Sequence, residues 1–278
     1  MSTTLTRALS GAVYVLLLIG ATLYSPYSFL LLFGTLLLFS IVEFCKLIHV
    51  KPMFPLLIAM VAFILFNLNN TIKTNEILLL IAALFVSGRA LLFLFEKHAK
   101  PLDLNSKYVF IIGYLIFPLI IFTKIPFLNT DSNFINTDSE NLYHPKVIIS
   151  ILIIIWINDT FAYLVGRSIG KKKLFERVSP KKTIEGFIGG LLFAAIGGIL
   201  LSRFYLTESI IKWIVIALII SIFGTLGDLI ESKFKRNAGV KDSGAIMPGH
   251  GGFLDRLDSI IFVAPFVYLF YQILYYVS

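Results

Sequence analysis

The sequence predicts an all-α, polytopic integral membrane protein with about nine transmembrane helices. Three observations support this fold class: 58% of the 278 residues are hydrophobic, only 14% are charged, and the mean hydropathy is +0.89. A soluble domain carries about 25% charged residues. A chain of 31.2 kDa has too little interior to bury this much apolar surface, so a soluble fold and intrinsic disorder are both excluded.

Apolar runs of about 17 to 25 residues, the length that spans a bilayer, define the predicted helices. They lie near residues 8–24, 27–47, 52–68, 77–95, 108–127, 146–166, 184–203, 211–230 and 259–276. The first run is kept as a membrane helix rather than a signal peptide, because no small-residue cleavage site follows it. We divide the chain into an N-terminal transmembrane region, 1–145, and a C-terminal catalytic region, 146–278, with four helices and two cytoplasmic loops.

The distribution of basic residues predicts the orientation. With the N-terminus in the cytoplasm and the C-terminus outside, 18 of the 24 Lys and Arg residues lie in inner segments and five in outer ones. Inner loops of membrane proteins are enriched in Lys and Arg. The same rule accounts for the net charge of +8, so nucleic acid is not an expected partner. The single cysteine, Cys45, cannot form an internal disulfide.

The first polar cluster lies at the inner end of the sixth run. Asp159, Tyr163 and Gly166 share one helix face, at i, i+4 and i+7. A carboxylate near a membrane helix end is costly and usually faces a polar cavity. Asp159 is therefore a candidate metal ligand, and the alternative is a buried ion pair with an arginine.

The loop that follows contains two groups of lysines. The spacing after Gly166 does not match a Walker phosphate loop, so a P-loop NTPase is rejected. Lys171–Lys173 are expected to set topology and to contact anionic lipid head groups.

Ser179-Pro180 predicts the start of a helix whose free N–H groups could meet an anion, with Lys181 and Lys182 beside it to bind phosphate. Glu185 lies at the start of the seventh run. It could cap that helix or take part in catalysis, and the sequence leaves both roles open.

The segment between the eighth and ninth runs is too rich in Gly, Lys, Arg and Asp to be a simple connector. Asp228 and Ser232 share a helix face, as do Asp255 and Asp258. Carboxylates at two helix ends suit a hard cation such as Mg²⁺. The basic residues expected to surround phosphates are Lys235, Arg236, Lys241 and Arg256. Glycines in the run Pro248–Gly252 let the backbone approach a ligand closely.

The order of the residues in this segment resembles the signature of a known enzyme family. The segment Ser232–Asp258 resembles the signature of phosphatidate cytidylyltransferases, also called CDP-diacylglycerol synthases, with Lys-Arg, Lys-Asp, His-Gly-Gly and Asp-Arg-apolar-Asp in the same order. Met247 stands where Leu, Ile or Phe is usual, and it keeps the position apolar. Asn158–Gly170 and Ser179–Gly186 resemble the family's upstream elements, whereas before residue 150 the likeness is only hydropathic.

The resemblance implies that CTP and phosphatidic acid react to give CDP-diacylglycerol and pyrophosphate with Mg²⁺, and a second cation is possible. It also implies a homodimer in the cytoplasmic membrane of a bacterium, at whose inner border the site lies. Metal ligands would be Asp228, Asp255, Asp258 and Asp159. Catalytic residues would be Asp228, Lys235, Asp255, Arg256 and His250, with His250 a proton donor or a hydrogen-bond anchor. Substrate-binding residues would be Ser179, Lys181, Lys182, Ser232, Arg236, Lys241, Asp242, Gly251 and Gly252.

Two other classes stay open on the sequence. A lipid-alcohol kinase, or a cytidylyltransferase for a prenyl-type lipid, would also bind a nucleotide at the membrane edge. A transporter could use Glu43 and Arg89, which lie within apolar runs, as pathway charges. The two side chains could equally pair with each other or with a helix end. No pair of broken, symmetry-related runs supports transport.

Overall fold

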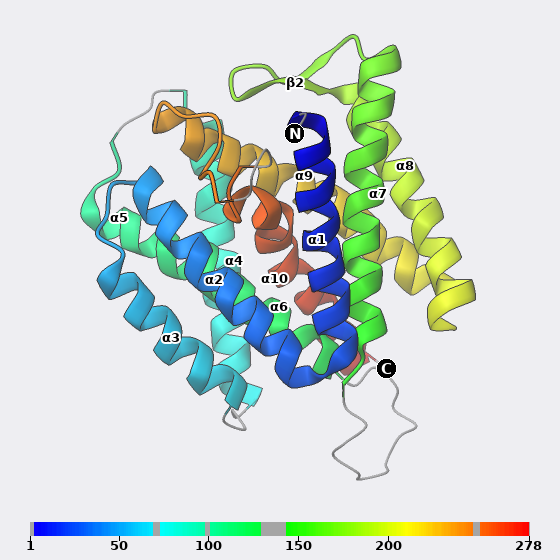
Figure 1. Cartoon of the computed structure of the whole chain (residues 1–278). Coiled ribbons are helices and arrows are strands. Elements are labelled where there is room, and N and C mark those ends of the chain that lie inside the picture. The colour runs from blue at the N-terminus through cyan, green and yellow to red at the C-terminus, as the bar shows by residue number, and fades with distance from the viewer. Residues whose placement is uncertain (1–2, 69–72, 98–100, 129–142, 247–250, 278) are drawn as a thin grey trace.

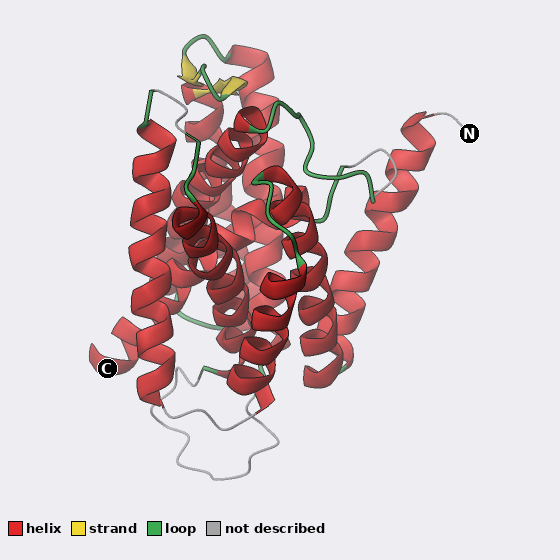
Figure 2. Ribbon diagram, turned by 90° about the vertical axis from the view of Figure 1, so that its left-hand side faces the viewer, coloured by secondary structure: helices red, strands yellow, loops and turns green. Residues whose placement is uncertain are grey.

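The computed structural model describes residues 3–68, 73–97, 101–128, 143–246 and 251–277. Helices account for most of them, arranged as one bundle (Figure 1, Figure 2). Their bounds are α1 Thr3–Tyr24, α2 Pro26–Leu47, α3 Met53–Leu68, α4 Lys73–Phe95, α5 Leu104–Val109, α6 Phe117–Lys124, α7 Pro145–Ile169, α8 Ile184–Leu201, α9 Ile210–Asn237 and α10 Leu254–Val277. Shorter π and 3-10 segments are η1 Phe110–Ile116, η2 Ile125–Phe127 and η4 Ser202–Leu206.

The helices confirm an all-α, polytopic architecture. Among the described residues, seven helical segments are long and apolar enough to cross a membrane. Two further apolar helices, Leu9–Tyr24 and Met53–Asn67, are shorter and coincide with the first and third predicted spans. The count of nine spans therefore stays a prediction.

The loop after α7 differs from the prediction, because it forms a β hairpin where a helix start was expected. Strand β1, Lys173–Phe175, pairs antiparallel with β2, Ser179–Thr183. The expectation that Ser179-Pro180 begins a helix is wrong: helix α8 starts at Ile184, and the Thr183 side chain caps it by accepting the Gly186 N–H. Proline is tolerated in β2 because each strand of a two-stranded sheet has a free edge.

The fifth predicted span is one continuous helical segment with a wide turn inside it. The π segment η1 ends two residues before Pro118. The backbone nitrogen of proline carries no hydrogen and cannot donate a hydrogen bond. Loss of that donor and the clash of the ring with the preceding turn favour such a local widening.

Helix packing places the polar segments near one another. Helix α10 packs against α9 and also against α4 and α6, while α7 packs against α8 and α1. At Gly189 of α8 an added Cβ would overlap Val165 of α7, so a small residue permits this close approach. Figure 1 shows the start of α1 and the β hairpin at one end of the bundle, and the last turns of α10 at the other.

Candidate active site

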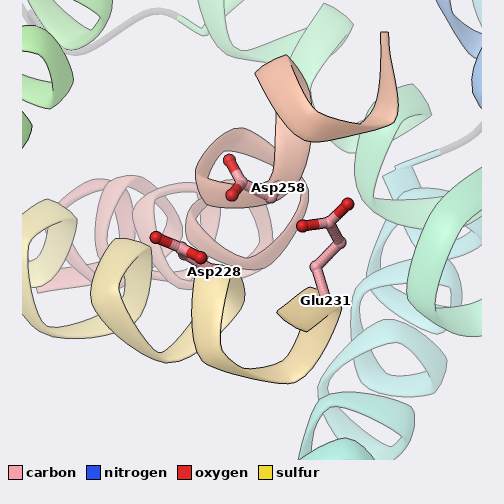
Figure 3. Close-up of side chains that lie close together, drawn as sticks. All are labelled: Asp228, Glu231 and Asp258. Atoms are coloured by element: carbon pink, nitrogen blue, oxygen red, sulfur yellow. The ribbon is translucent and has the colours of Figure 1, made fainter. Parts of the chain in front are cut away.

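Three carboxylates from two helices form the centre of the site. Asp228 and Glu231 belong to α9 and Asp258 to α10 (Figure 3). One oxygen of each lies within 4.8 Å of the others. Hard divalent cations prefer carboxylate oxygens. Three negative charges this close are unfavourable unless positive charge nearby compensates for their repulsion. The group therefore fits a divalent cation by both donor type and charge.

Two lysines supply positive charge to this acidic cluster of Asp228, Glu231 and Asp258. Lys182 Nζ of the hairpin lies 2.5 Å from Asp228 Oδ2. Lys235 Nζ lies 2.5 Å from Glu231 Oε2, one helical turn away. Burial disfavours the charge of Lys182, but the Asp228 carboxylate outweighs it and raises the pKa of the lysine above its ordinary value.

Asp255, a predicted metal ligand, lies outside the acidic cluster. Its Oδ1 accepts from Lys235 Nζ at 2.6 Å. Its Oδ2 accepts from the Ser243 N–H at 2.9 Å and from the Gly252 N–H at 2.8 Å. The Ser243 hydroxyl lies 2.9 Å from the same oxygen and 3.0 Å from Glu43 Oε2, so its one proton is shared between the two carboxylates. Both oxygens are therefore used within the protein, and Asp255 joins Lys235 to Ser243 and Gly252 of the loop before α10.

A cavity of about 270 Å³ lies beside the acidic cluster, between α1, α7 and α10. Its polar lining includes Asp159, Arg256 and Asp258, so the predicted ligand Asp159 faces the same space as the cluster. Its apolar lining includes Leu18, Leu152, Ile155 and Trp156. A charged end with an apolar wall suits an amphipathic ligand.

The hairpin brings only part of its predicted set to the cluster. Lys182 reaches Asp228, whereas Lys181 is exposed and Ser179 lies at the far end of β2 from α8. Glu185 accepts the backbone N–H groups of Lys171 and Lys172 at 3.0 to 3.2 Å. Its contacts tie the start of the hairpin to the first turn of α8.

Of the other predicted site residues, only Ser232 has a hydrogen bond to the cluster among the described contacts. The Ser232 hydroxyl donates to Asp228 Oδ1 at 3.2 Å. Arg236 donates to the Val240 carbonyl at 2.9 Å. Lys241 and Asp242 are exposed. Gly251 has a φ of 88°, a left-handed conformation that glycine adopts without strain. His250 lies outside the described residues.

Two site residues were missed from the sequence. Glu231 lies three residues after Asp228 on the same helix, so the helical spacing already places both on one face. For Glu43 the sequence leaves three interpretations open: a pathway charge, a pair with Arg89, or a contact with a helix end. A buried carboxylate within an apolar run needs donors, and the structure supplies them at a helix start. No pattern in the sequence indicates which donors these are.

Comparison with known proteins defines the class. The cytidylyltransferase family matches residues 5–274, so the chain belongs to this family and the resemblance found in the signature segment is confirmed. Among its relatives, a phosphatidate cytidylyltransferase of Staphylococcus haemolyticus is 49% identical over 134 residues, which is 48% of this chain and 50% of the relative. The Staphylococcus aureus (strain COL) protein of the same name is 51% identical over 135 residues, 48% of this chain and 50% of the relative. The chain thus spans about half the length of the curated relatives it matches.

Proposed function

We propose that this protein transfers a cytidylyl group from CTP to phosphatidic acid, giving CDP-diacylglycerol and pyrophosphate. The family match over residues 5–274 carries the proposal, and the names of the staphylococcal relatives support the choice of lipid. The acidic cluster beside an amphipathic cavity supports the same reaction, because one substrate is a charged nucleotide and the other a lipid.

The reaction needs charge neutralisation more than a strong base. A phosphate oxygen of phosphatidic acid forms a bond to the α-phosphorus of CTP, and the bond from that phosphorus to the β-phosphate oxygen breaks, releasing pyrophosphate. The attacking phosphate is already anionic at neutral pH, so no proton has to be removed first. Electrostatic stabilisation and in-line positioning are the main contributions that a protein makes to such transfers.

We assign the residues accordingly. Asp228, Glu231 and Asp258 would hold Mg²⁺, which neutralises phosphate charge when bound. Lys182 and Arg256 supply positive charge, from the hairpin and from the cavity wall respectively. The apolar lining lowers the local dielectric constant, so charge interactions at this end of the cavity are stronger than in water.

The cavity would admit the lipid. Its apolar lining from α1 and α7 would contact an acyl chain, and its charged end would receive the phosphate near Arg256. Phosphatidic acid likewise has a charged phosphate at one end and apolar acyl chains at the other. This match supports a lipid rather than a soluble molecule as the acceptor.

Turnover in detergent micelles tests the function. Purified protein with Mg²⁺, radiolabelled CTP and phosphatidic acid is expected to yield labelled CDP-diacylglycerol and pyrophosphate. The matched reactions replace CTP with ATP, or phosphatidic acid with a prenyl phosphate or diacylglycerol. Faster reaction of ATP with diacylglycerol would indicate a lipid kinase, and no turnover with any pair would contradict an enzyme of this kind.

The membrane orientation is part of the proposal. We place the protein in the bacterial cytoplasmic membrane as a homodimer, with the N-terminus and both polar loops in the cytoplasm, where CTP is found. Glu176, in the turn of the hairpin, and Ser209, before α9, are both exposed and lie in segments predicted on opposite sides. In a Cys45→Ala background, Ser209→Cys should react with an impermeant thiol reagent in spheroplasts, and Glu176→Cys only after lysis. Labelling of Glu176→Cys in intact spheroplasts would reverse the orientation.

A further inference from the structure

Glu43 is a buried carboxylate in the middle of the chain's apolar N-terminal half. It lies on α2 with only 1% of its surface exposed, and the residues beside it on that helix are buried as well. A charge in such a place is costly unless hydrogen bonds compensate for the lost water.

Among the described residues, the three groups that hydrogen-bond to Glu43 all come from more than 190 positions later in the sequence. The Phe253 N–H donates to Oε1 at 3.1 Å, and the Leu254 N–H donates to Oε2 at 2.9 Å. The Ser243 hydroxyl lies 3.0 Å from the same Oε2. Glu43 thereby contacts the loop between α9 and α10 at Ser243, within it, and at Phe253, its last residue.

The first two donors belong to the start of α10, which begins at Leu254. The N–H groups of a first helical turn lack partners within the helix, and a carboxylate there is favourable both as an acceptor and toward the helix dipole. Glu43 is thus an N-terminal cap supplied by another helix. Since Asp258 lies one turn further along α10, the cap fixes the height and rotation at which Asp258 meets Asp228.

Ser243 connects this cap to Asp255. Its hydroxyl is 3.0 Å from Glu43 Oε2 and 2.9 Å from Asp255 Oδ2, while Asp255 also binds Lys235. Gly252 passes so close that an added Cβ would overlap the Glu43 carboxylate and the Ser243 hydroxyl. The chain of contacts runs from α2 through the loop to Lys235, which is itself an ion-pair partner of Glu231 in the acidic cluster.

We propose that Glu43 is a positioning residue for cytidylyl transfer, acting on the acidic cluster through Ser243 and the first turn of α10. The idea rests on the proposed function, because it gives α2 a role in that reaction. It replaces the transport hypothesis for this residue, since the three donors that bind Glu43 belong to the loop and to α10 rather than to a continuous polar path.

The test compares Glu43→Gln with the matched control Ser40→Ala. Ser40 is buried on the same helix one turn earlier, and its hydroxyl has no hydrogen-bond partner among the described residues. Glu43→Gln keeps the side-chain size but removes the charge and one acceptor. We expect turnover to fall about 100-fold, because a displacement of about 1 Å in a reacting group has this effect. The Mg²⁺ concentration for half-maximal rate should rise, the KM for CTP should change less, and Ser40→Ala should match the wild type.

Two further measurements separate positioning from misfolding and from failure of the proposed function. Backbone amide exchange over 251–258, followed by mass spectrometry in detergent, should speed up in Glu43→Gln and not in Ser40→Ala; it requires no activity. Ser243→Ala combined with Glu43→Gln should lose little more turnover than Glu43→Gln alone, because both act through one network. Unchanged exchange together with unchanged Mg²⁺ dependence in a folded Glu43→Gln variant would overturn the role. An inactive wild type would instead contradict the proposed function. The exchange measurement would then still decide whether Glu43 caps the start of α10.

Discussion

The two polar segments that reach the acidic cluster are held by different means. The described parts of the segment 232–258 are fixed from inside: Asp255 and Glu43 are buried or nearly so and accept from its backbone and from Ser243. The hairpin segment 171–185 is fixed at the surface, by strand pairing and by Glu185. Charges in the first segment thus serve folding and chemistry together, whereas the exposed lysines of the hairpin, Lys171–Lys173, can be removed with less structural consequence.

The acidic cluster should give the largest effect. Asp258→Asn and Asp228→Asn each remove a charge from the group proposed to hold Mg²⁺, and we expect turnover to fall about 10³-fold or more. The control is Asp103→Asn, an exposed carboxylate before α5 with no place in the site. Turnover of purified protein, with gel filtration to verify folding, is the measurement. Near wild-type rates at ordinary Mg²⁺ in either variant would remove the cluster from the mechanism.

Variants of Lys235 and Arg256 compare a charge that serves both folding and chemistry with one that serves mainly chemistry. The Lys235 side chain is 10% exposed between Glu231 at 0% and Asp255 at 8%, so Lys235→Gln leaves buried carboxylates unpaired. Breaking a buried pair costs about 3–5 kcal/mol, so this variant should lose both stability and turnover. Arg256 is exposed at the cavity, and Arg256→Gln should lower turnover about 10²-fold with a smaller loss of melting temperature than Lys235→Gln. Equal melting temperatures for the two variants would contradict the contrast between them.

Asp255→Asn tests the residue whose predicted role differs most from its observed contacts. Because Asp255 binds Lys235 and the loop, we expect reduced thermal stability and a loss of turnover of about 10- to 100-fold. The Mg²⁺ concentration for half-maximal rate should stay near the wild-type value. A rise as large as that of Asp258→Asn would show that Asp255 is a metal ligand, as the sequence predicted.

The smallest effect is expected on the hairpin. Lys171→Gln, Lys172→Gln and Lys173→Gln together remove three exposed charges. Each lysine contributes about 1 kcal/mol of attraction to anionic lipid, and salt screens this attraction. Turnover should fall by no more than about tenfold and the loss should shrink at high ionic strength. A salt-independent loss as deep as that of Lys235→Gln would place these lysines in the active site.

The sequence alone was enough for features that depend on local composition and spacing. Apolar runs of membrane-spanning length predicted helical segments that the structure contains, because burial in lipid or protein requires such runs whatever their neighbours. The signature segment likewise identified the family, since Lys-Arg, Lys-Asp and Asp-Arg-apolar-Asp occur at fixed separations. Asp228 and Asp258 were also predicted as site residues from the sequence. Placing a carboxylate at a membrane border costs free energy, so its presence there indicates a functional role.

Only the tertiary structure decided which partner each of these groups meets. Asp255 and Asp258 lie three residues apart on α10, yet one binds Lys235 and the loop while the other joins Asp228 and Glu231. The helical period places both on roughly the same side but does not say which neighbouring helix lies there. The contact from Glu43 to Leu254 spans 211 positions, and nothing local to either residue specifies it. Such contacts follow from the packing of α2 against α10, because a buried carboxylate and the free N–H groups of a helix start are each satisfied only when the chain brings them together.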